Sequence, residues 1–130
     1  MINKIGFVLI AGLAGSLATG QAALAGDAEA GAKLFKRCAI CHSIEEGKRK
    51  MGPSLYGVYG RAAGALEGFR YSPAMKAYGG SGAVWGDETL DAFLANPKSV
   101  VPKTRMTAPP LKSADDRANV IAYRQSLGGE

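Results

Sequence analysis

Apolar residues recur at helical spacing in three stretches of the chain, and each stretch begins at polar residues that favour a helix start. We expect three helices, at about residues 27–40, 87–96 and 113–127. Pro97 ends the second, because a proline pushes the residue before it out of the helical region, and Gly128-Gly129 ends the last. The apolar residues of the three helices are Ala32, Phe35 and Ala39; Leu90, Phe93 and Leu94; and Ala118, Ile121, Ala122 and Leu127.

Prolines and glycines mark a further short helix and two long loops between these stretches. Ser72 and Pro73 form an N-cap and first-turn pair, and Gly79-Gly80 would end the short helix that they start. Residues 52–61 are rich in glycine and residues 98–112 lack a clear period, so both are expected to be loops. No segment shows a convincing β-strand pattern. The sequence therefore predicts an all-α domain of small helices and long loops.

The N-terminus has the composition of a secretory signal peptide. Lys4 supplies the charged start, an apolar run extends over residues 5–18, and Ala23-Leu24-Ala25 matches the small-x-small cleavage pattern. A retained membrane anchor is the alternative, but the run is shorter than the ~20 residues that span a bilayer. We expect cleavage after about Ala25, which gives a signal peptide at 1–25 and one domain at 26–130 without a permanent membrane anchor.

The chain is basic, with 16 Lys and Arg against 11 Asp and Glu and a net charge of +5 at pH 7. Loss of Lys4 with the signal peptide would leave a net charge of +4. A basic balance can indicate nucleic acid as a partner, but an exported chain meets none routinely. We therefore expect acidic protein partners and no nucleic-acid binding.

The pentapeptide Cys38-Ala39-Ile40-Cys41-His42 contains both cysteines and the only histidine of the sequence. C-x-x-C-H is typical of c-type haem attachment. Two thiols three positions apart can each form a thioether with a haem vinyl group, while the adjacent imidazole lies beneath the iron. The motif predicts one haem c, attached through Cys38 and Cys41, with His42 as an axial ligand of the iron.

Three other interpretations compete with haem attachment. Two cysteines in an exported chain often form a disulfide. A C-x-x-C pair can also be a thioredoxin-type redox site, but that site belongs to a βαβ pattern that this sequence lacks. Structural zinc usually needs four Cys or His ligands, and the chain has three in total. Zinc therefore fits poorly, whereas a disulfide and a redox pair stay open.

From residue 27 to residue 127, the order of motifs resembles the class I cytochromes c, closest to the short bacterial cytochrome c2 and mitochondrial cytochrome c group. Besides C-x-x-C-H, the shared positions are Gly31 and Phe35, G-P-x-L-x-G-x-x-G-R at 52–61, Gly68-Phe69-x-Tyr71, Trp85, Asn96-Pro97-Lys98, Pro102-x-Thr104-x-Met106 and Ile121-Ala122-Tyr123. This ordered series is far more specific than C-x-x-C-H alone. The resemblance implies a cytochrome c fold, in which the first and last helices cross and the loops surround a single haem.

The resemblance also implies His42 and Met106 as the two axial ligands of the iron. A thioether is a soft, neutral ligand that favours reduced iron, and a Met/His pair raises the reduction potential. Met1 leaves with the signal peptide, and Met51 lies too near the attachment site to reach the opposite haem face easily. Met75 is the remaining alternative, and motif context favours Met106.

Five further residues match cofactor contacts of the family. Pro53 is expected on the histidine side of the haem, where its carbonyl would accept the imidazole Nδ1 proton. Arg61, Tyr71 and Trp85 resemble the residues that hold the haem propionates, and Thr104 belongs to the methionine loop. Plain packing is the alternative role for each propionate contact, above all for Trp85.

Four positions depart from the family pattern, and all bear on the methionine ligand. Lys103 stands where the family often has glycine, so a left-handed turn there would cost strain. Ala108 replaces the usual aromatic residue, Phe93 lacks the hydroxyl of a tyrosine that bonds the methionine sulfur, and Pro110 replaces a common glycine. We therefore expect an Fe–Met106 bond that is present but easier to displace than in close relatives.

The expected function is that of a soluble, monomeric electron carrier in the periplasm, not an enzyme, whose iron cycles between ferric and ferrous states. Its partners would be redox proteins with acidic docking surfaces, such as a bc1 complex, a terminal oxidase or a periplasmic dehydrogenase of a respiratory chain. A basic rim around the haem edge would steer them, although an ordinary solvated surface is the alternative. The rim residues are Arg37, Lys98, Lys103, Arg105 and Lys112.

Other functions stay open at this point. With a labile Met106, the haem could bind peroxide or a small substrate as an enzyme, or bind nitric oxide or carbon monoxide as a sensor. The single histidine and the lack of an evident distal acid/base pair argue weakly against an enzyme. A carrier that serves as the dedicated subunit of one dehydrogenase is a further possibility.

Overall fold

The computed structural model of the chain describes residues 15 and 26–128. Apart from Gly15, the proposed signal peptide lies outside the described residues, and so does Gly129. The described elements, in chain order, are α1 (Ala28–Phe35), α2 (Pro73–Gly80), α3 (Asp87–Ala95), α4 (Pro97–Val100) and α5 (Ala114–Gln125). Between residues 26 and 128, the extended pairing is an isolated antiparallel bridge from Ala62 to Val84. The all-α fold class is confirmed.

α1 begins where the sequence predicts and ends earlier. The Asp27 carboxylate accepts hydrogen bonds from the backbone N–H groups of Glu29 and Ala30, at 2.9 and 3.2 Å, and caps the helix. The predicted extension to residue 40 is wrong, because after Phe35 the backbone passes into a series of turns. There the Cys38 N–H donates to the Phe35 carbonyl at 2.8 Å. The cysteines therefore lie on the turns that follow α1 in the sequence and not on the helix itself.

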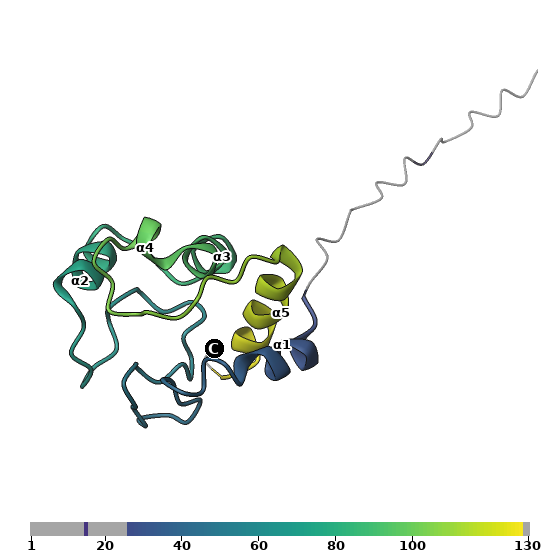
Figure 1. The fold of residues 1–130 in the computed structure, drawn as a ribbon, viewed down its shortest axis with the longest axis horizontal. Coiled ribbons are helices and arrows are strands. Elements are labelled where there is room, and N and C mark those ends of the chain that lie inside the picture. Colours follow the sequence, from purple (N-terminus) through teal and green to yellow (C-terminus); the bar gives the residue numbers. More distant parts are fainter. Residues whose placement is uncertain (1–14, 16–25, 129–130) are drawn as a thin grey trace, which may run out of the picture.

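α1 and α5 cross in close contact at one end of the molecule (Figure 1). At the crossing point Gly31 faces the backbone of Asn119, and a Cβ atom at this position would collide with that backbone. Beside it, the rings of Phe35 and Tyr123 pack with their centroids 5.2 Å apart. Glycine is thus required for the approach of the two helices, and the crossing that the resemblance implies is present.

The capping residues explain where α2, α3 and α5 begin. The Ser72 hydroxyl accepts a bond from the Met75 N–H at 3.1 Å, and the Ser113 hydroxyl accepts one from the Asp116 N–H at 3.2 Å. α3 begins after Gly86, whose N–H donates to the Thr89 hydroxyl at 2.8 Å. The predicted starts of these helices are confirmed to within one residue.

The one-turn helix α4 lies partly in the segment that we expected to be a loop, residues 98–112. Its N-cap is Asn96, whose side-chain oxygen accepts a bond from the Ser99 N–H at 3.3 Å, and Pro97 occupies the first turn. An Asn-Pro pair suits a helix start as well as a helix end. The same two residues therefore end α3 and begin α4.

One hydrophobic core connects the helices with the loops. Val101, Val120 and Leu90 are its most completely buried large side chains. The whole core consists of Phe35, Leu55, Val58, Ala63, Trp85, Leu90, Phe93, Leu94, Val101, Val120 and Ile121. Leu55, Val58 and Val101 come from loop segments, so the long loops are packed against the helices through these side chains. Among the described residues, no helix has the length and apolar character needed to cross a membrane.

Candidate haem site

The C-x-x-C-H pentapeptide forms two consecutive turns directly after α1. The N–H groups of Cys41 and His42 both donate to the Cys38 carbonyl, at 3.0 and 2.9 Å. Both cysteines are free and partly exposed. The turns therefore bring two free thiols and one imidazole into a single short segment, as covalent haem attachment requires.

His42 is fixed by the loop that follows it. Its Nδ1 donates a hydrogen bond to the Pro53 carbonyl at 2.8 Å, and because a carbonyl only accepts, Nδ1 carries the proton. Gly52 faces the imidazole so closely that a Cβ atom there would collide with the ring. The ring is thus held in one orientation, with Nε2 unprotonated and available to a metal.

Burial favours the neutral form of the imidazole. It lowers the pKa of His42, and the nearby positive charge of Arg124 lowers it further, while the Pro53 hydrogen bond acts in the opposite direction. Iron binds the neutral form of imidazole. The hydrogen bond to Pro53 and the burial of the ring therefore both favour a neutral imidazole whose Nε2 can bind a metal.

Met106 lies in a loop of unusual backbone geometry. Its N–H donates to the Thr104 hydroxyl at 3.2 Å, and the Thr104 N–H donates to the Val101 carbonyl at 3.0 Å. Lys103, between them, has φ +63° and is the only non-glycine residue with positive φ among the described residues. The left-handed turn expected at Lys103 is confirmed, so this loop carries a strained residue three positions before the thioether.

A cavity of about 190 Å³ adjoins the half-buried Met106. Its wall includes Ala108 and Pro110, two of the positions that depart from the family pattern. The remaining lining residues are Asn96, Pro97, Lys98, Thr107 and Pro109. Ala108 is exposed, so no bulky side chain covers the methionine from this direction.

Arg61 and Tyr71 lie close enough to affect each other's ionisation. The Arg61 guanidinium donates to the carbonyls of Tyr56 and Ser54, at 3.1 and 3.2 Å. Burial lowers the pKa of Arg61 and raises that of Tyr71, and each shift is opposed by the charge of the partner. The structure therefore brings together two of the three residues that we expect near the propionates.

Trp85 is a core residue in this structure. Its side chain is 7% exposed and packs between Tyr78 and Phe93, with ring centroids 5.6 and 5.1 Å away. Its backbone N–H donates to the Arg61 carbonyl at 2.9 Å, which ties it to the proposed propionate residues. This geometry agrees with the packing alternative, and a bond from the indole to a propionate stays a prediction.

The two other methionines of the described domain differ from Met106. Met51 is 83% exposed on the loop beyond the attachment site. Met75 lies on α2 and packs against the core, half-buried. Only Met106 combines partial burial with a loop position and an adjoining cavity.

The donor set fits a haem c. Two free thiols stand three positions apart, beside a neutral imidazole whose Nε2 is available, and a thioether is present in the loop at residues 101–111. A further observation is independent of the motif. The Nε atom of Arg124 is buried and has no hydrogen-bond partner among the described residues, as expected where a bound group completes the interior.

The model of the cytochrome c family, described as "Cytochrome c", matches residues 28–128. This chain belongs to the cytochrome c family. Cytochrome c from Euglena viridis is 48% identical over 103 residues, which cover 78% of this cytochrome and 98% of that protein. Cytochrome c2 from Afifella marina is 46% identical over 99 residues, which cover 75% and 80%.

Among solved structures, cytochrome cH from Methylobacterium extorquens superposes on this cytochrome with a TM-score of 0.72 at 38% sequence identity. The match covers 78% of this cytochrome and 99% of that chain. The fold class and the class I family are therefore confirmed. The cytochrome binds haem c covalently through Cys38 and Cys41, and the family function is haem-based electron transfer.

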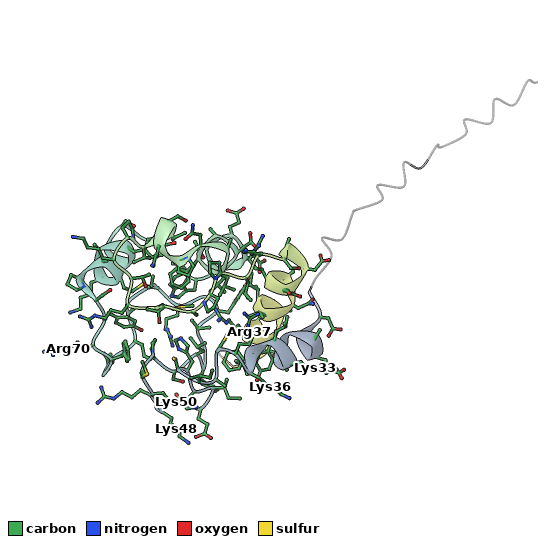
Figure 2. The ribbon with its side chains drawn as sticks, in the orientation of Figure 1. Lys33, Lys36, Arg37, Lys48, Lys50 and Arg70 are labelled. Carbon is green, nitrogen blue, oxygen red and sulfur yellow. The ribbon has the colours of Figure 1, made fainter. Side chains whose placement is uncertain are left out.

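Basic side chains are abundant on the surface of this cytochrome. The five residues of the predicted rim, from Arg37 to Lys112, are all exposed. Figure 2 shows a second group in the lower part of the view, with Lys33 on α1, Lys36 directly after it, and Lys48 and Lys50 on the following loop. All four residues are exposed. The surface next to the attachment site therefore also carries exposed cations, beyond the five residues of the predicted rim. One of them, Lys48, is paired with Glu45 at 3.1 Å.

Proposed function

We propose that this cytochrome is an electron carrier of the periplasm, without enzymatic activity, whose haem iron is bound by His42 and Met106. The observation that carries the proposal is the 2.8 Å hydrogen bond from His42 Nδ1 to the Pro53 carbonyl. It leaves Nε2 as a metal ligand in a fixed ring. When bound, haem c supplies a one-electron ferric/ferrous couple.

The residues around the site do three things in this proposal. Pro53 and Gly52 hold the imidazole in place, so that the iron keeps one stiff ligand in both oxidation states. Met106 supplies the soft ligand that favours the ferrous state. If His42 and Met106 both bind the iron, they would leave no position for a substrate, and such an arrangement would suit transfer of an electron.

Arg61 and Tyr71 would hold the propionates. A guanidinium has five N–H donors, and Arg61 uses two of its nitrogen atoms on the Tyr56 and Ser54 carbonyls, so donors remain for a carboxylate. The partly buried cation would offset the cost of burying a negative charge beside an apolar macrocycle. Tyr71, close to the same guanidinium, would add a hydroxyl donor.

The surface charge supports docking to acidic redox proteins. The exposed rim residues and the cations of the attachment side would raise the rate of encounter with an acidic surface, and salt would weaken this effect. We propose a bc1 complex, a terminal oxidase or a periplasmic dehydrogenase of a respiratory chain as partners. The charged start, apolar run and Ala-Leu-Ala site of residues 1–25 support export, and we propose that the carrier is a monomer.

A redox titration of the purified holoprotein, followed by its absorption spectrum, tests this function. We expect a reversible one-electron transition, low-spin spectra in both states, and the ferric charge-transfer band near the red edge of the visible range that reports methionine ligation. A high-spin ferric spectrum, together with turnover of peroxide or tight binding of carbon monoxide, would instead identify an enzyme or a sensor.

A further inference from the structure

Arg124 is a buried cation that has no part in the proposed electron-carrier function as described above. It lies near the C-terminal end of α5, in the last turn, and its side chain is 4% exposed. Buried arginines normally have all their donors satisfied or are paired with a carboxylate. Here the Nε atom has no hydrogen-bond partner among the described residues.

The ion pairs of the described residues leave Arg124 out. One joins Lys48 to Glu45 at 3.1 Å on the surface, and the other joins Arg117 to Asp91 at 2.6 Å. Arg117 lies on the same helix as Arg124 and has its carboxylate, so α5 carries one paired arginine and one arginine without an acidic partner in the described part of the chain.

The guanidinium of Arg124 lies close to both the attachment thiol and the axial imidazole. Burial lowers the pKa of Arg124, whereas the charge of Cys38 and a side-chain hydrogen bond with Cys38 raise it. The charge of Arg124 in turn lowers the pKa of His42. Arg124 is therefore coupled to two residues of the C-x-x-C-H motif.

Haem attachment changes the Cys38 side chain, the group that raises the pKa of Arg124. A thioether sulfur carries no charge, so Cys38 cannot offset the charge of Arg124 once it is bonded to the haem. Arginine does not lose its proton in proteins, so the positive charge remains. This charge is buried and acts on His42, and salt screens a buried charge little.

We propose that Arg124 sets the reduction potential of this cytochrome, because its buried positive charge disfavours the ferric state and so raises the midpoint. This inference rests on the proposed electron-carrier function. The electron comes from the redox partner, the guanidinium keeps its proton, and no bond to Arg124 forms or breaks. The effect is purely one of charge: the iron site gains a positive charge on oxidation, and a nearby cation opposes that gain.

The test compares midpoint potentials of the holoprotein in four forms: wild type, Arg124→Gln, Arg124→Leu and Arg124→Lys. Both neutral variants should shift the ferrous to ferric ratio at a fixed ambient potential about tenfold toward ferric, which equals a fall of ~59 mV for one electron. Arg124→Lys keeps the charge and should stay within about twofold of the wild type. Arg124→Leu provides the test if Arg124→Gln does not fold, because an apolar side chain suits a buried position.

Arg37→Gln is the matched control, since Arg37 precedes Cys38 in the sequence but is exposed. Its removal should change the ratio less than about twofold, and added salt should abolish even that change. The shift in Arg124→Gln should persist in salt. Neutral variants that keep the wild-type midpoint would overturn the proposal, and so would a fall in Arg124→Lys as large as in Arg124→Gln.

The absorption spectrum separates this outcome from a failure of the proposed function. If the wild type itself lacks the ferric methionine band, the ligand assignment is wrong. If the wild type and all variants keep the band but share one midpoint, the ligands stand and the role of Arg124 is refuted.

Discussion

The two sides of the proposed haem site are built in opposite ways. On the histidine side, the His42 ring is bonded to the Pro53 carbonyl and has no free space beside Gly52. On the methionine side, Met106 follows a strained Lys103 and adjoins a cavity of about 190 Å³. A cavity of about 340 Å³ adjoins His42 as well, so the two sides differ in how the ligand is held and not in open space. The His42 ring is fixed in place, whereas Met106 lies in a loop that contains a strained residue.

The contrast suggests how one small protein can combine permanent cofactor binding with an adjustable ligand. The histidine is held by a hydrogen bond and by steric exclusion, and both would have to be disrupted to move it. Met106 follows Lys103, whose backbone conformation costs energy, so a loop movement that relaxes Lys103 would favour displacement of Met106. We therefore expect ligand exchange to occur on the methionine side alone. Four predictions test this contrast, in order of expected effect.

The largest effect is expected for Gly52→Ala. The added methyl group would collide with the His42 ring, and overpacking of this kind typically costs about 1–3 kcal/mol of unfolding free energy. Gly80→Ala is the control, because a Cβ atom there meets nothing within 4 Å and φ is not positive, so its cost should be near zero. Denaturant unfolding of both holoproteins measures the difference. Equal stability of the two variants would show that Gly52 does not hold the His42 ring by close contact.

The second prediction concerns Lys103→Gly. Relief of the left-handed strain should stabilise the holoprotein by about 1 kcal/mol and slow imidazole binding to the ferric form about fivefold. Lys112→Gly is the control, since this exposed residue has no positive φ, and here glycine should destabilise slightly. Denaturant unfolding and stopped-flow absorbance measure both effects. If both glycine variants lose stability, Lys103 stores no strain that bears on the ligand.

A smaller effect is expected for Ala108→Phe. An aromatic ring over the cavity beside Met106 should slow imidazole binding about two- to threefold, because partial burial of the ring contributes about 0.5 kcal/mol to the closed loop. Ala77→Phe places the same ring at an exposed position on α2, outside the cavity lining, and should leave the rate unchanged. Equal rates in the two variants would mean that ligand access does not pass through this cavity.

The smallest effect at physiological salt is expected from the surface charges. A double change of Lys98 and Arg105 to Glu should slow electron exchange with a purified bc1 complex several-fold at low salt and little at 0.15 M. Changing Lys33 and Lys36 to Glu removes the same charge from the attachment side (Figure 2). If both pairs slow the reaction equally, the net charge of the protein steers the partner, and Lys98 and Arg105 have no special part in docking.

Much of this architecture was predictable from local sequence signals. Ser72, Ser113 and Asp27 each cap a helix as their positions indicate, because capping depends on a few neighbouring atoms. The positive φ of Lys103 was predicted from the family pattern, since a turn that usually holds glycine keeps its shape when lysine replaces it. The His42–Pro53 contact was also predicted, and the structure contains it.

Other features could not be predicted in this way. The first helix stops at Phe35, although the helical spacing of apolar residues continues to Ala39, because the turns of the cysteine motif replace the helical bonds. Arg124 reads as a surface residue near a helix end, and only the packing of α5 shows that it is buried. The one feature of the sequence that could have indicated the burial of Arg124 is its place next to Tyr123, on the helix that packs against α1.

The ferric absorption spectrum of three purified forms, wild type, Met106→Ala and Met75→Ala, tests the central claim most directly. If His42 and Met106 bind the iron, the charge-transfer band of methionine ligation is present in the wild type and in Met75→Ala. It is lost in Met106→Ala, which becomes high-spin. Persistence of the band in Met106→Ala, or its absence from the wild type, would contradict the account.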